Sequence, residues 1–341
     1  MYKVAVVGAT GRVGSEMISI LKERNFPISK LYAIASDSSA GKRIKFDETT
    51  TVIVQKLEGF DFSGIDIVLS TAGAEISAEF AERAVKQGAL VIDNTSYFRN
   101  DPLIPLIIPE INLDQLSNYK TKGIISNPNC TTIQILLALA PLHKTFKIKR
   151  IVASTYQSVS GAGNEGLDEL FNQTKNIYSN VNINYALEKD RVFTKQIAFN
   201  LIPHIDEFLE DGFTKEEQKI VLETQKILAS NILVSATCVR VPVFIGHSVA
   251  LNVEFVNDIT EKQVREVLDK APGVVVVDHR ADEGYVTPFE AAGEDDVYVS
   301  RLRRDKTVKN GLSMWVVADN LRKGAALNAI QIAEEVIKFK A

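Results

Sequence analysis

The sequence is poor in the features that hold small secreted proteins together or carry a chain through a membrane. It has 2 cysteines in 341 residues, which is too few for a disulfide framework and is typical of a reducing compartment. Its most apolar run, 133–142, contains Gln134 and Pro141 and is well short of the ~20 residues that a membrane span needs. The N-terminus lacks the basic, apolar and small-residue segments of a secretory signal. We therefore expect a cytoplasmic protein that spans no membrane.

The chain also lacks an excess of positive charge. Its 39 lysines and arginines are balanced by 43 aspartates and glutamates, for a formal net charge of −4, so bulk electrostatics favour neither nucleic acid nor an anionic membrane as a partner. Hydrophobic residues make up 45% and charged residues 24%, as in ordinary globular proteins. This composition excludes a disordered chain, and the length predicts about two domains.

Strands and helices alternate in the first part of the sequence. Short β-branched runs separated by amphipathic stretches predict a doubly wound, Rossmann-like parallel sheet, and the fold class is therefore α/β. The expected strands are 3–7, 31–35, 65–70, 90–94 and 124–126, and the expected helices are 13–25, 77–87 and 130–140.

The pattern changes near residue 150, where long alternating strands predominate. Alternation is typical of antiparallel strands with one covered face, so we expect a second, α+β domain with a mostly antiparallel sheet. Its expected strands are 151–158, 232–245, 249–256, 274–277, 297–304 and 312–318, and its expected helices are 165–178, 215–230 and 261–271. The amphipathic segment 321–338 is expected to return to the first domain. The predicted domains are thus 1–128 completed by 320–341, and 129–319.

A glycine-rich turn joins the first strand to the first helix. Gly8, Gly11 and Gly14 have the spacing Gly-x-x-Gly-x-x-Gly, which lets the backbone approach a pyrophosphate at a helix N-terminus. Two signals follow the second strand. Asp37 lies 23 residues after Gly14, near the distance at which an acid binds the ribose of NAD. The neighbouring serines and Lys42 instead suit the 2′-phosphate of NADP, and the residues alone leave both cofactors open.

Cys130 is the candidate nucleophile. Pro128 ends a strand, Asn129 is a good helix N-cap, and Cys130 then falls in the first helical turn. The positive end of a helix stabilises a thiolate and lowers its pKa, and the thiolate is the form that attacks an acyl group. Cys238 lies within a strand of small apolar residues and is expected to be structural.

Several ordered motifs together resemble the aspartate-semialdehyde dehydrogenase family over nearly the whole chain. They are Gly8-Ala-Thr-Gly-Arg-Val-Gly14, Asp93-Asn-Thr-Ser-Tyr-Phe-Arg99, Asn127-Pro-Asn-Cys130, Ser154-Thr-Tyr-Gln157-Ser-Val-Ser-Gly-Ala-Gly163, Glu216-Glu-Gln-Lys219, Cys238-Val-Arg240 with Gly246-His247-Ser248, and Trp315-Val-Val-Ala-Asp-Asn320. The resemblance implies reversible reduction of 4-aspartyl phosphate to aspartate 4-semialdehyde with release of phosphate. That reaction serves the biosynthesis of lysine and diaminopimelate, threonine and methionine.

The resemblance also assigns roles to residues. Cys130 is the nucleophile, His247 the general acid and base, and Gln157 the group that positions the acyl chain. The binding of substrate and phosphate is assigned to Arg240, Glu216, Arg99, Lys219 and Asn129. The cofactor is assigned to Gly8, Thr10, Gly11, Arg12, Val13, Gly14, Ser36, Ser38, Ser39, Ser160, Gly161 and Asn320. It implies no metal, and it implies self-association as a homodimer or a tetramer.

The sequence departs from the family after the second strand. The family commonly has an arginine there, in a Lys-Arg-Ser-Ala-Gly-like stretch, whereas this chain has Ser38 at that position and Asp37 before it. We expect NADP as the cofactor, with NAD as the alternative. Two rival functions are a related N-acetyl-glutamyl-phosphate reductase, whose cysteine motif usually reads Asn-Pro-Gly-Cys, and a non-catalytic relative that binds only the cofactor.

Overall fold

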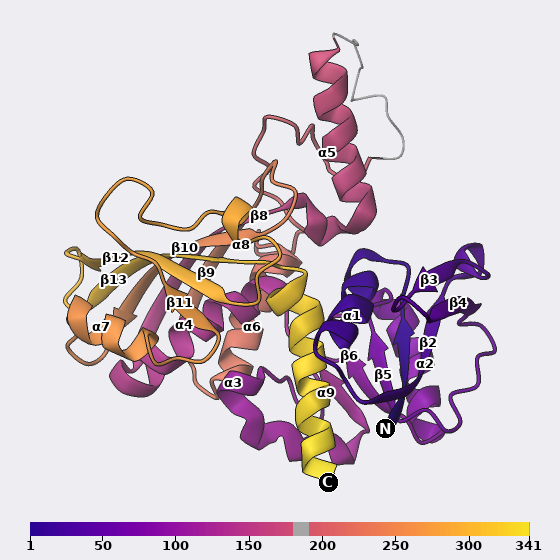
Figure 1. Cartoon of the computed structure of the whole chain (residues 1–341). Helices are drawn as coiled ribbons and strands as arrows, with labels where there is room; N and C mark the ends of the chain where they lie inside the picture. Colours follow the sequence, from indigo (N-terminus) through magenta and orange to yellow (C-terminus); the bar gives the residue numbers. More distant parts are fainter. Residues whose placement is uncertain (180–190, 341) are drawn as a thin grey trace. The chain divides into compact units, whose positions relative to one another are not determined.

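The computed structural model describes residues 1–179 and 191–340 (Figure 1). Internal contacts divide the chain into two compact units. The first unit is Met1–Asn129 with the C-terminal segment from Ala325, and the second is Cys130–Gly324. The units are described one at a time below.

A seven-stranded sheet forms the centre of the first unit, in the order β3-β4-β2-β1-β5-β6-β7. Its strands are β1 (Tyr2–Val7), β2 (Ile28–Ala35), β3 (Arg43–Lys45), β4 (Thr51–Lys56), β5 (Ile67–Ser70), β6 (Leu90–Asp93) and β7 (Ile124–Ser126). All neighbours from β4 to β7 pair in parallel. The strand order reverses between β1 and β5, which is the switch point at which doubly wound sheets bind ligands.

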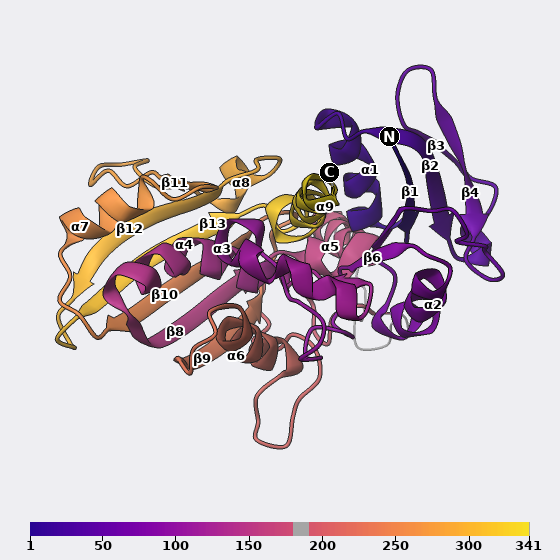
Figure 2. The ribbon, with the colours of Figure 1, turned by 90° about the horizontal axis from the view of Figure 1, so that it is seen from below.

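Helices cover both faces of this sheet, and the burial of β1 explains why. Val4 and Val6 pack in one apolar cluster with α1 (Arg12–Glu23) and α9 (Leu327–Lys340). Ala5 and Val7 point to the opposite face and pack with α2 (Ala74–Lys86), because successive side chains of a strand alternate between faces. Figure 2 shows α1 and α2 on opposite sides of the strands. The predicted Rossmann-like fold is confirmed.

One part of this sheet differs from the prediction. Strands β3 and β4 form an antiparallel hairpin at the edge, where we expected no strand. Most of their side chains are exposed. Strand β4 nevertheless contains the β-branched run Thr51–Val54, a strand signal that the prediction missed. Between the strands and helices lie the short helices η1 (Asp37–Ser39), α3 (Pro109–Asn112) and η2 (Leu113–Thr121).

The second unit contains a six-stranded sheet in the order β11-β12-β13-β10-β8-β9. Its strands are β8 (Ile148–Gln157), β9 (Leu233–Arg240), β10 (His247–Phe255), β11 (Val274–Val276), β12 (Val297–Asp305) and β13 (Gly311–Ala318). The four central strands pair antiparallel, whereas each outer strand pairs parallel with its neighbour. The mostly antiparallel sheet of the α+β prediction is confirmed.

The apolar helix α4 (Cys130–Phe146) packs against this sheet and against two other helices. The other helices of the unit are η3 (Val159–Ala162), α5 (Gly163–Tyr178), α6 (Lys215–Ile227), α7 (Glu261–Leu268) and α8 (Pro288–Ala291). Helix α4 continues through Pro141, where we expected it to end. Proline only removes one backbone donor and strains one turn, and the buried apolar face of α4 outweighs that cost.

Two other boundaries differ from the expected ones. The strand expected over 232–245 ends at Arg240, because Pro242 has no N–H to donate to a strand partner. The C-terminal helix, expected over 321–338, begins as a π-helical turn, η5 (Arg322–Ala326), before α9. Residues 320–324 stay with the second unit, since the side chain of Asn320 accepts the N–H of Gly246.

Among the residues described, no helix is long and apolar enough to cross a bilayer.

Gly14 offers a direct test of the glycine turn. A Cβ there would lie 2.2 Å from the carbonyl oxygen of Gly8, so Gly14→Ala must push the turn and α1 apart. We expect a loss of about 1–3 kcal/mol of stability, measured by thermal unfolding followed by circular dichroism.

Gly73→Ala is the matched control, because a Cβ at Gly73 would meet nothing within 4 Å and its φ is not positive. Equal melting temperatures for the two variants would contradict the close packing of the turn.

Candidate active site

Five elements of the second unit bring the predicted catalytic and substrate residues into one region. Cys130 is the first residue of α4, Gln157 the last of β8, Glu216 lies in the first turn of α6, Arg240 ends β9 and His247 begins β10. In the parallel pair β8 and β9, Gln157 stands opposite Arg240. The sheet therefore sets the spacing of these side chains more firmly than a loop would.

Cys130 occupies a partly exposed position at the N-terminus of α4. Its Sγ is 3.9 Å from the Oγ1 of Thr131. Gly324 allows the chain to pass close by, since a Cβ there would lie 3.0 Å from the Cβ of Cys130. A sulfur at this point of a helix gains from the potential of the unpaired N–H groups when it carries negative charge.

Cys238 has the opposite environment. It is fully buried in β9, and burial is the main cause that raises the pKa of its thiol, with the nearby Glu216 carboxylate adding to the effect. A buried neutral thiol is a poor nucleophile. Its expected structural role agrees with this environment.

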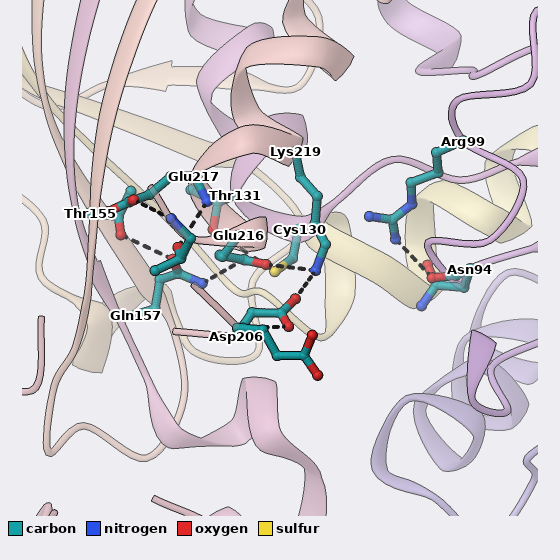
Figure 3. Close-up of polar contacts among 12 residues, drawn as sticks. Asn94, Arg99, Cys130, Thr131, Thr155, Gln157, Asp206, Glu216, Glu217 and Lys219 are labelled. Carbon is teal, nitrogen blue, oxygen red and sulfur yellow. Dashed lines mark hydrogen bonds and ion pairs between the residues drawn. The ribbon is translucent and has the colours of Figure 1, made fainter. Parts of the chain in front are cut away.

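The Gln157 side chain is buried and held on both sides (Figure 3). Its Oε1 accepts a hydrogen bond from the Oγ1 of Thr155 at 3.0 Å. Its Nε2 donates to the Oε1 of Glu216 at 3.1 Å. A strand-end amide bonded at both ends has a fixed orientation, which suits a group that positions another molecule.

Glu216 and Lys219 form an ion pair on one face of α6, with Lys219 Nζ 3.1 Å from Glu216 Oε2. The ordinary reading of such a pair is a solvated surface contact, but Glu216 is only 6% exposed. Lys219 also binds Asp206 Oδ2 at 2.7 Å. Burial opposes the positive charge, yet the two carboxylates together raise the pKa of Lys219 above its usual value.

Asp206 was not predicted from the sequence. It lies in a connecting segment with a left-handed φ of 68°, and nothing in the local sequence indicates that the chain brings it to Lys219. A non-glycine residue with positive φ is the only signal it carries, and that signal exists only in the structure.

Glu217 anchors the start of α6. A capping box is present: Thr214 N–H donates to Glu217 Oε2 at 2.8 Å, and Glu217 N–H donates to Thr214 Oγ1 at 3.3 Å. Glu217 Oε1 also accepts the backbone N–H of Cys238 at 3.0 Å. Helix α6 is thus tied to β9, which fixes the direction of the adjacent Glu216 (Figure 3).

Arg240 is a buried cation with a neutral partner. Its Nη1 donates to the carbonyl oxygen of Ser158 at 2.7 Å, and its guanidinium carbon is 5.8 Å from the centre of the Phe193 ring. Burial lowers the pKa of Arg240, while the nearby Glu216 and Cys130 oppose the change. An arginine stays protonated in such a site, so it presents a positive charge that suits a carboxylate.

His247 is completely buried and has its two ring nitrogens in different environments. Its Nδ1 lies 3.0 Å from the backbone nitrogen of Ser158 and 3.0 Å from the Oγ of the same residue. Its Nε2 has no hydrogen-bond partner within the described part of the chain. Burial and, second, the charge of Arg240 lower the pKa of His247 to about 3, so the ring is neutral at pH 7.

Gly161 brings Arg240 and His247 to the same point. A Cβ at this position would lie 3.0 Å from Arg240 Nη1 and 3.4 Å from His247 Nε2. The resemblance assigns Gly161 to the cofactor, and the geometry adds a second reason for glycine here, since any side chain would press on both residues.

Asn320 and Ser160 form a polar network on the Nδ1 side of His247. Asn320 Oδ1 accepts from Ser158 Oγ at 3.1 Å, from Ser160 Oγ at 3.1 Å and from the N–H of Gly246 at 3.0 Å. Ser158 was not predicted as a site residue, yet it contacts Arg240, His247 and Asn320. Its only signal is its place directly after Gln157.

In the first unit, Arg99 is buried, whereas an isolated arginine in a loop is more often exposed. Its Nε donates to the carbonyl oxygen of Asn127 at 2.9 Å, and its Nη2 donates to that of Asn94 at 2.9 Å. Asn129, also buried, immediately precedes Cys130. The carbonyl groups of Asn127 and Asn94 hold the guanidinium in one orientation, and Figure 3 shows the contact with Asn94.

The glycine turn has the form of a dinucleotide cradle. Gly8 has a φ of +86°, and a Cβ there would lie 3.0 Å from the backbone of Thr71. Gly11 is the N-cap of α1, which has no side-chain cap, so the first amides of Arg12, Val13 and Gly14 stay available to an anion. This cradle fits the pyrophosphate of a dinucleotide.

Hydroxyl groups and one cation gather at the end of β2. Ser39 Oγ lies 3.3 Å from both Thr10 Oγ1 and Lys42 Nζ. Ser36 Oγ and Ser38 Oγ lie 3.0 Å apart. Asp37, between these two serines, is exposed. The described residues contain no group of three or more histidine, cysteine, aspartate or glutamate side chains placed to hold a metal ion.

Comparison with known proteins identifies the family. Residues 3–119 match "Semialdehyde dehydrogenase, NAD binding domain", and residues 139–323 match "Semialdehyde dehydrogenase, dimerisation domain". An aspartate-semialdehyde dehydrogenase of Rickettsia bellii is 50% identical over 337 residues, which cover 99% of this chain and 98% of that protein. The chain belongs to the aspartate-semialdehyde dehydrogenase family.

Solved structures of the family agree with this assignment. The structure of aspartate semialdehyde dehydrogenase II complexed with ASA from Vibrio cholerae matches with a TM-score of 0.95 at 45% identity, over 99% of this chain and 98% of that one. The structure of the enzyme with NADP from Candida albicans matches with a TM-score of 0.73 at 25% identity, over 98% of both chains. As a member of this family, the protein is an oxidoreductase with a nucleotide-binding domain.

The neutral, buried state of His247 predicts a specific acid sensitivity. As the pH falls below 6.5, the unfolded chain takes up a proton on this residue and the folded chain does not, so stability falls with pH down to about 3. Relative to His247→Gln, the wild type should lose about 1.4 kcal/mol per pH unit below 6.5. Urea unfolding followed by the fluorescence of Trp315, the single tryptophan, measures this in the second unit.

His279→Gln is the control, since His279 is exposed. A difference between wild type and His247→Gln that stays constant from pH 7 to pH 5 would show that His247 is not a buried neutral base.

Proposed function

We propose that the protein reduces L-4-aspartyl phosphate to L-aspartate 4-semialdehyde with NADPH, reversibly and through a thioester on Cys130. The observation that carries the proposal is the Arg240–Ser158–His247 arrangement in the same unit as a cysteine at a helix N-terminus. This arrangement supplies an anchor for a carboxylate, a titratable imidazole and a nucleophile, which are the three groups that the reaction needs.

In the proposed first step, the thiolate of Cys130 attacks the acyl carbon. A bond forms between sulfur and carbon, the carbon–oxygen bond to phosphate breaks, and phosphate leaves with a proton from solvent. Gln157 Nε2 orients the acyl group. The positive potential at the start of α4 stabilises the sulfur in its anionic form. Asn129, the residue before Cys130, is proposed to contact the substrate.

The amino-acid part of the substrate is proposed to bind through charge. Arg240 takes the α-carboxylate, because a guanidinium offers two parallel donors to a carboxylate. Glu216 takes the α-ammonium group. Lys219 and Arg99 are assigned to the phosphate group, and both carry positive charge held by fixed partners.

His247 is the proposed general acid and base at the reacting oxygen. Its Nε2 is the nitrogen without a protein partner among the described residues, so this atom is the one that can serve the substrate. A histidine that holds or moves a proton in this role typically contributes a factor of about 10²–10⁴ in rate.

NADP is the proposed cofactor, and when bound it supplies a hydride to the acyl carbon or accepts one from it. The residues proposed to hold it are Gly8, Thr10, Gly11, Arg12, Val13, Gly14, Ser36, Ser38, Ser39, Ser160, Gly161 and Asn320. The preference for NADP over NAD is supported by the hydroxyl cluster with Lys42, which can replace the arginine that the family commonly has near Ser38.

We also propose the division of labour between the two parts of the chain. The first unit, which includes the C-terminal helix α9, would bind the dinucleotide, and the second unit would carry catalysis and dimerisation. The name of the matched family domain supports self-association, and a homodimer, or a tetramer built from it, is the proposed assembly. The low cysteine content supports a cytoplasmic setting.

The rival readings are less well supported. The relatives bear the name of aspartate-semialdehyde dehydrogenase and not that of N-acetyl-glutamyl-phosphate reductase. A non-catalytic cofactor-binding relative would have no need of both Cys130 and His247 beside a buried Arg240.

Steady-state kinetics test the reaction and the cofactor together. We expect NADPH formation from aspartate semialdehyde to require phosphate, and kcat/KM to be higher with NADP than with NAD. N-acetyl-glutamate semialdehyde should be a poor substrate. A higher kcat/KM with NAD would overturn the cofactor assignment without affecting the reaction itself.

Lys42→Ala refines this measurement, because Lys42 lies next to the proposed 2′-phosphate site. It should raise KM for NADP and leave KM for NAD nearly unchanged. Lys45→Ala in β3 is the matched control, since it removes an exposed lysine three residues away.

The two cysteines allow a paired test of covalent catalysis. Cys130→Ala should leave less than about one per cent of wild-type turnover and should still bind the dinucleotide. Cys238→Ala removes the buried thiol and should keep most of the activity. Each variant is mixed with the acyl phosphate, the reaction is quenched, and the protein is analysed by mass spectrometry. Of the two variants, only Cys238→Ala should show an aspartyl adduct. Retained turnover in Cys130→Ala would exclude the thioester.

A further inference from the structure

We propose that Ser158 is a positioning residue for His247. Its hydroxyl oxygen accepts a hydrogen bond from the ring Nδ1–H whenever His247 works as an acid or base at Nε2. The proposal rests on the function proposed above and adds a residue to it. Ser158 lies within the motif 154–163, directly after Gln157, but the resemblance assigns it no role.

Ser158 contacts both charged and titratable groups of the site through different atoms. Its carbonyl oxygen accepts from Arg240 Nη1 at 2.7 Å. Its backbone N–H donates to His247 Nδ1 at 3.0 Å, and its Oγ lies 3.0 Å from that same nitrogen. The backbone contacts remain in any variant at this position, so the effect of Oγ can be isolated.

The backbone contact defines the resting state of the ring. An amide N–H can only donate, so Nδ1 must offer a lone pair, and the hydrogen of the neutral ring must be on Nε2. In this tautomer His247 can donate a hydrogen bond at Nε2. It cannot remove a proton there, because the lone pair of a neutral Nε2–H nitrogen belongs to the aromatic ring.

Proton transfer at Nε2 therefore requires a hydrogen on Nδ1. When the ring takes up a proton from solvent, Nδ1–H faces the N–H of Ser158, and that contact is repulsive. Ser158 Oγ is then the acceptor at hydrogen-bond distance. The hydroxyl hydrogen of Ser158 can point to Asn320 Oδ1 at 3.1 Å. The hydroxyl group then accepts a hydrogen bond from His247 and donates one to Asn320.

The proton balance is then complete. The imidazolium gives its Nε2 proton to the oxyanion formed by hydride addition to the thioester; the N–H bond breaks and the O–H bond of the thiohemiacetal forms. The ring remains neutral with its hydrogen on Nδ1. On collapse to the aldehyde, Nε2 takes the same proton back and Cys130 leaves as a thiolate.

The charged groups around His247 make this acceptor necessary. Arg240 of β9 disfavours a positive ring, and Glu216 of α6 favours it but does not compensate for burial. Two other residues lie against the ring, Ser158 just before η3 and Gly161 within it, and neither is charged. Asn320, which bonds to Ser158 Oγ, is also uncharged. Ser158 Oγ is thus the contact that stabilises Nδ1–H directly.

Ser248 provides a matched control. It directly follows His247, it is 1% exposed like the fully buried Ser158, and its Oγ has no hydrogen-bond partner in the described residues. Ser248→Ala removes a buried hydroxyl of the same size beside the same histidine without removing a hydrogen bond.

The test compares Ser158→Ala, Ser158→Cys and Ser248→Ala in the full-length protein. Loss of a hydrogen bond to a charged group predicts a kcat about tenfold to a hundredfold lower in both Ser158 variants, with KM for the semialdehyde within about twofold of wild type. In the reductive direction, the pH at which kcat falls should move to lower pH in these variants. Ser248→Ala should resemble wild type in all three quantities.

Nuclear magnetic resonance of the 15N-labelled imidazole rings tests the resting tautomer without any turnover. With 4 histidines in the chain, His247→Gln assigns the signal, and we expect Nε2–H at neutral pH. A resting Nδ1–H tautomer, or Ser158 variants with the kcat and pH profile of Ser248→Ala, would overturn the proposal. Failure of the wild type to turn over would instead contradict the function, and the tautomer measurement would still decide on Ser158.

Discussion

The active region depends on one hydrogen bond, from the guanidinium of Arg240 to the carbonyl oxygen of Ser158. A buried cation needs a partner, and a neutral carbonyl satisfies it without cancelling its charge. The positive charge therefore stays available to an anionic substrate. The same contact holds the peptide unit that leads from β8 into η3, and the next contacts of Ser158, with His247, depend on where that peptide lies.

Burial acts on two titratable side chains of the same unit with different outcomes. It keeps the ring of His247 neutral, because desolvation and the Arg240 charge both act against a second positive charge. It leaves Lys219 charged, because two carboxylates outweigh the desolvation. The second unit thus holds the ion pair of Lys219 with Glu216 and the neutral imidazole of His247, so different side chains serve the binding of charge and the movement of a proton.

The sequence predicted the chemistry better than the boundaries. The glycine turn and Cys130 at the start of α4 depend on local rules of backbone geometry, and local rules can be read from neighbouring residues. Asp206 and Ser158 were missed because their importance comes from contacts made across the fold. The passage of α4 through Pro141 was missed because packing overrides a local preference. Strand β4 was missed although its run Thr51–Val54 is β-branched and favours a strand.

The pairing of β8 with β9 places Gln157 opposite Arg240, and the pairing of β10 with β13 places His247 opposite Ala318. These three side chains are therefore fixed by strand ladders. The connection 241–246 accepts backbone hydrogen bonds from Val159 and Ser160, so a change in its length would disturb η3 while leaving the ladders paired. A slip of β9 by a single residue would instead turn Arg240 to the other face of the sheet and present a valine in its place.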